Sequence, residues 1–388
     1  MTAADDRPSE LRGRLVLPDG VVFGRLTLED GRIASVDPEA PAEVAPGARH
    51  DDAATGPIIA PGFVDLHVHG FGGHDAMGGP DALDGMARAL LRRGVTSFLP
   101  TAVTAPLSAL ARFAETVRDW GPRRLDDGAA PLGFNLEGPF LAEARKGAHD
   151  GASLRTPASL TTAELEPLLD GLRVVTIAPE LPGSLGLIAE LAGRGVAVSL
   201  GHSAATVDEA RRGYAAGARS TTHLFNAMTG LDHRAPGLAL AALLDDEIAV
   251  ELIADGHHVA RDVWPLITRL KPRSKLLLVS DALAVAGTAE ASGRVGGLAI
   301  EVVGGRAVLA GTETLAGSVI GLDEAVRNLV GVGIPLHDAI ATASTNPLDL
   351  LGETGRGRIA VGQIADLVEL DSALRVRRVM RGGRWLEA

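Results

Sequence analysis

Apolar and polar positions alternate along the chain in a way that divides it into two kinds of region. Between residues 58 and 357, short apolar runs alternate with stretches whose apolar residues recur at helical spacing and end at a glycine, as in residues 82–94. The short runs predict eight strands, at residues 63–67, 96–100, 132–137, 174–178, 196–200, 220–223, 249–253 and 276–281. Eight strand–helix units in succession are typical of a (β/α)8 barrel.

The two ends of the chain follow a different pattern. Residues 11–59 hold alternating apolar runs separated by Asp19-Gly20 and Asp30-Gly31, and Asp-Gly is a strong hairpin signal. Residues 358–388 resemble them. We therefore predict an α/β fold in which a barrel domain, residues 58–357, carries a small β-sandwich domain formed by residues 1–57 and 358–388. A glycine-rich stretch at residues 291–312 predicts a hairpin inserted after the eighth strand.

Polar residues with catalytic potential stand where the predicted strands end. Active sites of (β/α)8 barrels lie at the C-terminal ends of their strands. The residues at these ends are His67 and His69 after the first strand, Glu137 after the third, His202 after the fifth, His223 after the sixth and Asp281 after the eighth. Residues that are distant in sequence are therefore expected to meet in one site.

The residue types at these positions indicate a metal centre. His67 and His69 point to the same face of a strand, about 6.5–7 Å apart along it, so both imidazoles can reach one ion. Glu137, His202 and His223 form a set of three ligands that leaves a position open for water, as in catalytic sites. We predict one or two divalent ions, zinc first, with iron, manganese or cobalt as alternatives. Asp281 is the candidate general base and acid; its alternative role is to cap the following helix.

Composition narrows the function classes. The chain has 388 residues, of which 46% are hydrophobic and 22% charged, as in ordinary globular proteins. It has no cysteine, which excludes thiolate ligands and nucleophiles. A net charge of −12 argues against nucleic acid as a partner. The chain has no apolar run of membrane-spanning length and its N-terminus lacks the apolar core of a signal peptide, so we expect no membrane association and a cytoplasmic location.

Six segments at the strand ends carry a family resemblance. They are, in order, PGFVDLHVHG, LEGPF, GHSAA, THLFNAM, ADGHHV and VSDAL. Together they resemble the N-acetylglucosamine-6-phosphate deacetylases of the amidohydrolase superfamily, over nearly the whole chain. The first segment marks the superfamily, whereas residues 135–140 and 223–228 are specific to the deacetylases. The resemblance implies a metal-dependent hydrolase that removes acetate from N-acetyl-D-glucosamine 6-phosphate to give D-glucosamine 6-phosphate, in amino-sugar catabolism or recycling.

The resemblance also assigns roles to individual residues. It gives the principal ion to Glu137, His202 and His223, and it makes a second ion possible at His67 and His69, with Glu137 as the bridge. It makes Asp281 the proton carrier and implies a homodimer. The residues that it implies for the phosphorylated amino sugar are His149, Asn226, Ala227, Arg234, His258 and Leu315, with His258 also catalytic and Arg234 reaching the partner subunit's site. His74, His233, His257 and His337 receive no role.

Other functions stay open at this stage. A related amidohydrolase could deacylate another N-acyl amino sugar or an N-acyl amino acid, and a barrel without catalysis could bind a sugar or a protein. Hydrolases that bridge two ions with a carbamylated lysine are disfavoured. The three lysines, Lys146, Lys271 and Lys275, all lie away from the predicted strand ends.

Overall fold

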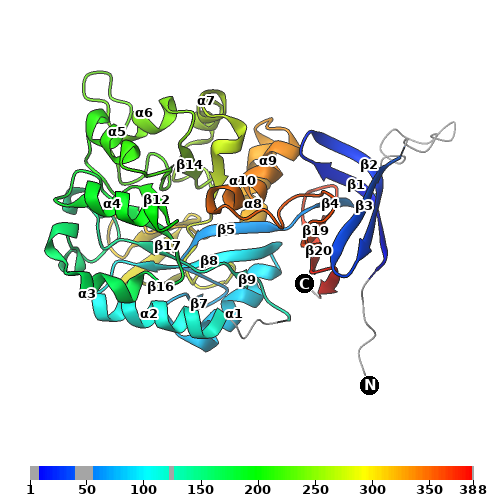
Figure 1. The fold of residues 1–388 in the computed structure, drawn as a ribbon, viewed down its shortest axis with the longest axis horizontal. Helices are drawn as coiled ribbons and strands as arrows, with labels where there is room; N and C mark the ends of the chain where they lie inside the picture. Colours follow the sequence, from blue (N-terminus) through cyan, green and yellow to red (C-terminus); the bar gives the residue numbers. More distant parts are fainter. Residues whose placement is uncertain (1–7, 40–55, 122–125, 387–388) are drawn as a thin grey trace.

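A computed structural model describes residues 8–39, 56–121 and 126–386. Its centre is a parallel sheet whose eight main strands follow one another in sequence order (Figure 1). They are β5 (Phe63–Val68), β8 (Val95–Val103), β10 (Phe134–Glu137), β11 (Leu172–Ile177), β12 (Ala197–Leu200), β13 (Ser220–Thr221), β14 (Ala249–Leu252) and β15 (Leu276–Leu278). A parallel bridge between Val68 and Ala282 links the first strand to the segment after the last. The sheet is thus the predicted (β/α)8 barrel, and each main strand overlaps a predicted one.

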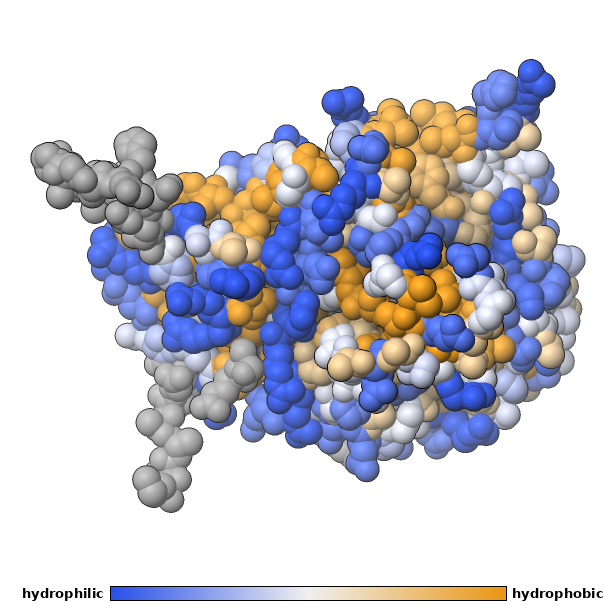
Figure 2. All heavy atoms as spheres, turned by 180° about the vertical axis from the view of Figure 1, so that it is seen from behind, coloured by the Kyte–Doolittle hydropathy of each residue, from blue (hydrophilic) through white to orange (hydrophobic). Residues whose placement is uncertain are grey.

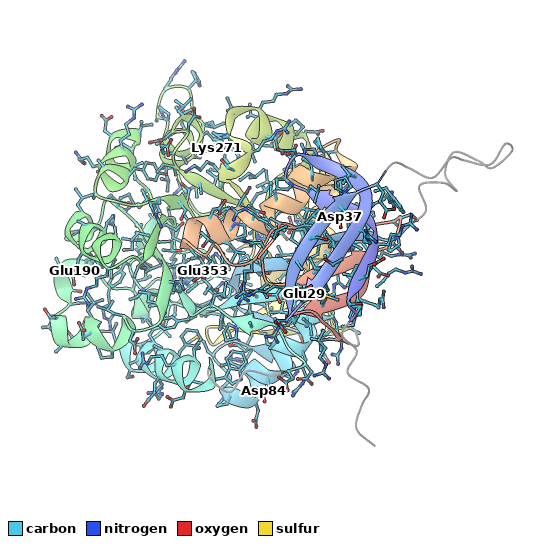
Figure 3. The ribbon with its side chains drawn as sticks, turned by 45° about the vertical axis from the view of Figure 1, so that its right-hand side comes forward. Glu29, Asp37, Asp84, Glu190, Lys271 and Glu353 are labelled. Carbon is cyan, nitrogen blue, oxygen red and sulfur yellow. The ribbon has the colours of Figure 1, made fainter. Side chains whose placement is uncertain are left out.

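Helices cover the outside of the barrel (Figure 1). They are α1 (Pro80–Leu91), α2 (Leu107–Trp120), α3 (Thr162–Leu165), α4 (Ser184–Gly193), α5 (Val207–Ala215), α6 (Leu238–Leu244), α7 (Trp264–Leu270), α8 (Leu322–Gly331), α9 (Leu336–Thr342) and α10 (Thr345–Leu351). Helix α1 shows why they dock, because its buried residues recur at spacings of three and one: Leu83, Met86, Ala87, Leu90 and Leu91. Charged side chains such as Glu190 project outward (Figure 3).

Both ends of the chain contribute to one smaller sheet. Its seven strands lie in the order β21-β20-β19-β4-β1-β2-β3. Their bounds are β1 (Glu10–Leu17), β2 (Gly20–Glu29), β3 (Arg32–Pro38), β4 (Ile58–Pro61), β19 (Leu367–Leu370), β20 (Val376–Arg381) and β21 (Arg384–Leu386). Both Asp-Gly hairpins are present, and Asp30 and Gly31 have the positive φ values, 48° and 75°, that a tight hairpin turn requires. The separate β domain that was predicted from both termini is therefore present, and the strands expected in a sandwich are joined in a single hydrogen-bonded sheet.

The position of β4 bears on the domain boundary. This strand pairs with β1 in parallel and with β19 in antiparallel fashion, so residues 58–61 hydrogen-bond within the small sheet. The first barrel strand begins at Phe63. We propose that the barrel domain starts at Gly62, four residues after the predicted boundary. Ile359 and Ala365 pack in the core of the small sheet, which supports the predicted boundary after residue 357.

An insertion follows the last barrel strand, as the glycine-rich sequence predicted. It is a three-stranded antiparallel sheet of β16 (Ser292–Val295), β17 (Leu298–Val303) and β18 (Arg306–Leu309). Its apolar side chains share a core with residues at the C-terminal end of the barrel, including Val103 and Leu283. The insertion therefore packs against the end of the barrel where the strand-end residues lie.

Short elements complete the described chain. They are the strands β6 (Gly70–Phe71), β7 (His74–Asp75) and β9 (Ala130–Pro131) and the 3-10 turns Glu143–Arg145, Gly151–Ser153, Pro157–Ser159, Glu166–Leu168, Arg261–Val263 and Arg273–Lys275. None of the helices in the described ranges is long and apolar enough to cross a membrane. The rear face mixes polar residues with apolar groups that gather in a few places (Figure 2).

Candidate active site

The carboxylate of Glu137, at the end of β10, is the centre of a buried cluster. Its Oε1 atom lies 2.9 Å from His223 Nε2 and 3.0 Å from His202 Nε2. Its Oε2 atom lies 3.1 Å from the Nε2 atoms of both His69 and His149. All five residues are buried. Side chains from four barrel strand ends and one loop thus meet at one carboxylate.

Asp281 and His67 complete the cluster on its other side. Asp281 Oδ1 lies 3.1 Å from His69 Nε2 and 3.6 Å from His67 Nε2. The Nε2 atoms of His67 and His69 are 3.3 Å apart. Two overlapping sets offer one ligand atom each within 4.8 Å of one another: His67, His69, Glu137 and Asp281, and Glu137, His149 and His202. The structure therefore brings together every residue that was predicted to hold an ion.

Three of these side chains are directed inward by an uncommon backbone conformation. His202, His223 and Asp281 have φ values of 46°, 28° and 48°, each just after a strand ends. Residues with a Cβ atom rarely adopt this left-handed region, which costs about 1–3 kcal/mol per residue. Surrounding hydrogen bonds hold it in place. The Asp281 N–H, for example, donates to the His67 carbonyl at 2.8 Å.

Two of the imidazole rings are oriented by carbonyl acceptors on their outer nitrogens, whereas His223 Nδ1 has no hydrogen-bond partner among the described residues. His69 Nδ1 lies 3.1 Å from the Thr101 carbonyl, and His202 Nδ1 lies 2.8 Å from the Arg145 carbonyl. A carbonyl oxygen only accepts, so each Nδ1 carries the proton and each Nε2 presents a lone pair to the cluster when the ring is neutral. Lone pairs that converge on shared carboxylates are the arrangement of a cation site.

Charge in the cluster leads to the same conclusion. Burial has the largest effect on His67 and His69 and works against protonation. Glu137 and Asp281 nevertheless outweigh it, so the pKa of His67 lies well above its usual range and that of His69 rises to about 9. The two carboxylates thus draw positive charge into a buried space. A divalent cation supplies that charge, and imidazole and carboxylate ligands suit zinc, iron, manganese and cobalt. The residues present fit such an ion.

His149 borders both the cluster and the cavity. It was predicted to contact the substrate, and it is among the residues that line the cavity. Its Nε2 atom lies 3.1 Å from Glu137 Oε2, and its Nδ1 atom accepts a hydrogen bond from the Thr104 N–H at 3.2 Å. Burial, its largest influence, lowers the pKa of His149 to about 4. A neutral ring that donates to Glu137 is poorly suited to balance a phosphate charge. The turn at Gly147, in the loop that carries His149, was not predicted from the sequence.

A cavity of about 450 Å³ opens above the cluster. His69, Glu137, His202, His223 and Asp281 lie among the residues that line it, and the insertion contributes Leu315 and its neighbours. None of the three lysines lines this cavity, so the cavity offers no lysine side chain that could be carbamylated to bridge two ions. A larger cavity of about 760 Å³ lies between the barrel and the small sheet and contains none of the predicted site residues.

Asn226 and Ala227 both line the cavity, but they differ in whether their backbone N–H group is free to bind a ligand. The Asn226 backbone N–H donates to the His223 carbonyl at 3.0 Å, and its side-chain amide donates to the carbonyls of His223 and Leu224. The Ala227 N–H has no acceptor among the described residues. Ala227 also has a positive φ of 48°. Of these two residues, Ala227 is therefore the one with a backbone donor free for a ligand.

His258 faces the cavity with a carboxylate behind it. Its Nδ1 atom lies 2.7 Å from Asp255 Oδ2, so this ring is also oriented from outside. Burial is the largest influence on His258 and opposes protonation, but the hydrogen bond to Asp255 and its charge outweigh it and raise the pKa of His258. A protonated His258 can donate from Nε2 into the cavity while Nδ1 stays bound to Asp255.

Two arginines are relevant to the predicted phosphate contact. Arg234 is exposed, lies outside the cavity lining of its own chain, and has its backbone N–H bound to Asp232. Arg145 is the only lysine or arginine among the described residues that line the cavity. Its guanidinium has no acceptor within the described part of the chain, which leaves it available to an anionic ligand.

Two residues near the cluster, Arg145 and Glu251, were not predicted from the sequence, and Asp255 was noted after the seventh strand but given no role. Glu251 carried a signal, because it is a single carboxylate inside the apolar run of β14. Asp255 stands within the ADGHHV segment, three residues before His258. Arg145 gave none, since nothing in its sequence context distinguishes it from other loop arginines.

Comparison with known proteins identifies the family of the chain. Residues 58–386 match the amidohydrolase family. The N-acetylgalactosamine-6-phosphate deacetylase of Escherichia coli O157:H7 is 39% identical over 371 residues, which cover 93% of this chain and 94% of that protein. The N-acetylglucosamine-6-phosphate deacetylase of Homo sapiens is 37% identical over 345 residues, covering 84% and 83%.

A solved structure extends the comparison to the fold. A mutant N-acetyl-D-glucosamine-6-phosphate deacetylase of Mycobacterium smegmatis, in complex with N-acetyl-D-glucosamine-6-phosphate, matches with a TM-score of 0.88 at 35% identity. The match covers 98% of this chain and 99% of that one. The family match and the buried histidine–carboxylate cluster at the barrel strand ends, which is able to hold a metal ion, place the chain among the hydrolases of the amidohydrolase kind. The chain belongs to the amidohydrolase family, among its N-acetylglucosamine-6-phosphate deacetylases, as the sequence resemblance predicted.

Proposed function

We propose that this chain hydrolyses the acetamide of N-acetyl-D-glucosamine 6-phosphate, giving acetate and D-glucosamine 6-phosphate. The observation that carries this proposal is the convergence of Glu137, Asp281 and the histidines at the base of an open cavity. The family supports the reaction, and the M. smegmatis relative in complex with this sugar phosphate supports the substrate.

The cluster would hold one or two divalent ions, and zinc is the first candidate. Glu137, His202 and His223 would bind the first ion, and His67 and His69, with Glu137 as the bridge, would bind the second. A bound ion polarises the amide carbonyl and lowers the pKa of water toward neutrality. The short Nε2-to-carboxylate distances and the charges of Glu137 and Asp281 support both positions.

Asp281 would carry the proton through the reaction. Burial, the largest influence on this carboxyl, opposes ionisation, but the charge of His67 and the hydrogen bond from His69 outweigh it and hold the pKa of Asp281 below its usual range. The ionised carboxylate accepts a proton from the attacking water as the new C–O bond forms. It then returns that proton to the amide nitrogen as the C–N bond breaks, so that the sugar leaves as an amine.

Groups on the cavity wall would hold the substrate during these steps. His258, kept in place by Asp255, would donate from Nε2 to the acetyl oxygen as negative charge develops there. The free Ala227 N–H and the Arg145 guanidinium would bind the phosphate, since arginine forms paired, charge-assisted hydrogen bonds with phosphate oxygens. Asn226 would support the turn that presents Ala227, and Leu315 of the insertion would pack against the substrate.

We also propose a homodimer in which Arg234 reaches the partner's site. Four exposed large apolar side chains, Leu231, Leu244, Leu266 and Leu270, lie on α6, on α7 and in the loop that carries Arg234. Exposed apolar residues gathered near one segment are typical of an interface. A cytoplasmic location stays a prediction from the sequence.

Acetate release tests the proposal directly. The purified chain, loaded with zinc, would be incubated with N-acetyl-D-glucosamine 6-phosphate and with unphosphorylated N-acetyl-D-glucosamine, before and after chelation. We expect chelator-sensitive release from the phosphorylated sugar alone. Equal release from both sugars would contradict the role of the phosphate, and release that survives complete ion removal would contradict the role of the metal.

A second candidate substrate is N-acetyl-D-galactosamine 6-phosphate. The E. coli O157:H7 relative named for this sugar is 39% identical, against 37% for the human N-acetylglucosamine-6-phosphate deacetylase. The two sugars differ only in the orientation of one hydroxyl group. Comparing kcat/KM for both 6-phosphates in one assay distinguishes them, and a tenfold preference for the galactosamine derivative would favour this second candidate.

A further inference from the structure

A buried carboxylate outside the proposed reaction connects the two halves of the cluster. Glu251 lies on β14 and is 1% exposed. Its Oε2 atom lies 3.2 Å from His67 Nδ1 and also 3.2 Å from the backbone nitrogen of His223. One oxygen therefore accepts hydrogen bonds from a ligand of each proposed ion.

The chemistry of this contact differs from that of the neighbouring histidines. His69 and His202 are oriented by backbone carbonyls, whereas His67 has a carboxylate behind its Nδ1 atom. A carboxylate is costly to bury, by several kcal/mol, and a neutral residue would fill the same space. It also forms a stronger, charge-assisted hydrogen bond and makes the opposite ring nitrogen a better electron donor. Its presence behind His67 therefore calls for a functional reason.

We propose that Glu251 is a positioning residue that enables the cluster to bind a second ion. It keeps the His67 proton on Nδ1, so that the Nε2 lone pair faces Glu137 and Asp281. This inference rests on the proposed metal-dependent function, and it identifies the residue that determines whether the chain binds one ion or two.

Both contacts are made by the Glu251 side chain, but its removal affects the two partners unequally. The His67 ring loses its outer hydrogen bond completely when the carboxylate is removed. The turn at His223 keeps a main-chain bond, since the Leu224 N–H donates to the Glu251 carbonyl oxygen at 2.8 Å. His223 Nε2 also keeps its contact with Glu137. Loss of the side chain should therefore weaken the His67–His69 position far more than the first one.

Ion binding, measured without substrate, tests this inference. The variants would be Glu251→Leu, which removes the acceptor, Glu251→Asp, which shortens it, and Glu251→Gln, whose amide oxygen can accept the same two N–H groups. Glu369→Leu is the matched control, because it removes a buried carboxylate on β19, paired with Arg378 and far from the cluster. Each apo protein would be titrated with Co²⁺, and ions per chain, dissociation constants and the visible absorption of the cobalt would be recorded.

We expect two ions per chain for the wild type and for E369L. E251Q, which keeps an acceptor without the negative charge, should bind the second ion more weakly than the wild type and more tightly than E251L. E251L and E251D should bind the first ion normally and the second about 10–100-fold more weakly. Circular dichroism of the apo proteins checks that each variant folds. If E251L does not fold, E251D tests the inference in its place. Unchanged affinity for both ions in a folded E251L or E251D would overturn the inference.

A double-mutant cycle separates this role from a purely structural one. In a His67→Ala background, the Glu251→Leu change should have little further effect on ion binding. An equal loss of first-ion affinity in both backgrounds would show that Glu251 acts through the fold at His223, against the inference. A wild type that binds only one ion would also overturn it, while leaving hydrolysis with one ion intact. A wild type that binds none would overturn the proposed function itself.

Discussion

The small sheet and the C-terminal rim of the barrel use buried positions in opposite ways. The core of the sheet consists of apolar side chains such as Leu15, Leu26 and Ile33, and its charges form ion pairs, such as Arg12–Glu39 at the surface and the buried Glu369 with the exposed Arg378. The rim buries Glu137, Asp281 and their histidines together. Surface pairs contribute about 0–1 kcal/mol, whereas buried charges cost stability unless they are compensated. Buried positions in the sheet therefore serve the fold, and those in the rim serve chemistry.

The largest expected effect of a single substitution lies in the rim. Asp281→Asn removes the proposed proton carrier while keeping its shape, and general acid–base catalysis contributes about 10²–10⁴-fold. We expect kcat for N-acetyl-D-glucosamine 6-phosphate to fall about 10³-fold, with the fold unchanged by circular dichroism. Activity within tenfold of the wild type would remove Asp281 from the mechanism. Ion content measured on the same samples checks for a different cause, since its loss would assign Asp281 to ion binding.

In the small sheet, we expect a core substitution to lower stability and to leave activity nearly unchanged. Leu26→Ala truncates a fully buried side chain of β2 and should lower the free energy of unfolding by about 2–5 kcal/mol. The kcat of the folded protein should stay within about twofold of the wild type. Urea denaturation and steady-state kinetics measure the two effects. Val21→Ala, at a 40% exposed position of the same strand, is the matched control and should change stability by less than about 0.5 kcal/mol.

Removing the cavity arginine should have a smaller effect, on binding. Arg145→Ala removes a cation from the cavity but keeps the backbone carbonyl that orients His202. A charged hydrogen bond is worth about 1.5–3 kcal/mol, so KM for the phosphorylated sugar should rise about 10–100-fold with kcat little changed. Arg194→Ala, an exposed arginine on the outside of the barrel paired with Glu190, is the control. An unchanged KM would leave the phosphate to Ala227 and to Arg234 of a partner subunit.

The smallest expected effect is a shift in the pH dependence of kcat/KM, caused by a substitution at the barrel rim. Asp255 raises the pKa of His258, and its own pKa is lowered by that partner even though burial, its largest influence, acts in the opposite direction. Asp255→Asn should therefore lower the pKa of His258, and the alkaline limb of kcat/KM should move to lower pH. An NMR titration of the imidazole protons and a pH–rate profile measure both shifts. A limb that does not move would contradict the role of protonated His258.

Linkage gives the same pair a defined effect on stability. The raised pKa of His258 means that its contribution is complete below the unfolded value near 6.5 and is lost as pH rises through the folded pKa. The lowered pKa of Asp255 means that its contribution is complete above the unfolded value near 3.8 and is lost as pH falls through the folded pKa. In the Asp255→Asn variant the dependence from Asp255 should be absent, and the dependence from His258 should weaken or reverse because burial then lowers the pKa of this histidine.

Much of the fold could be predicted from the sequence because apolar runs and turn residues are local signals. Central parallel strands are buried on both faces and therefore appear as continuous apolar runs, which located all eight strands of the barrel. Asp30-Gly31 marked a turn because its geometry requires positive φ. The strand β4 was the exception. Its four apolar residues fit either sheet, and its partners β1 and β19 are decided by contacts that lie far away in sequence.

The residues of the site that lie at strand ends could also be predicted from local signals, but those in the loops could not. Residues at strand ends must meet in a barrel, so Glu137, His202 and His223 could be grouped without knowing the loops. His149 and Arg145 belong to a loop whose path over the barrel depends on tertiary packing, and their positions relative to Glu137 were not predictable. Glu251 reaches His67 across the barrel interior, a distance of 184 positions along the chain.

The pairing of β4 with β19 also has a consequence for how the chain is made. Residues 58–61 leave the ribosome about 300 residues before their partner at 367–370. Until then β4 presents an unpaired edge, which is a template for association with other chains. The small sheet can close only after residues 367–370 have been synthesised, and by then all strands of the barrel are already present. A nascent chain that terminates before residue 367 would keep that edge open and should require a chaperone to stay unaggregated.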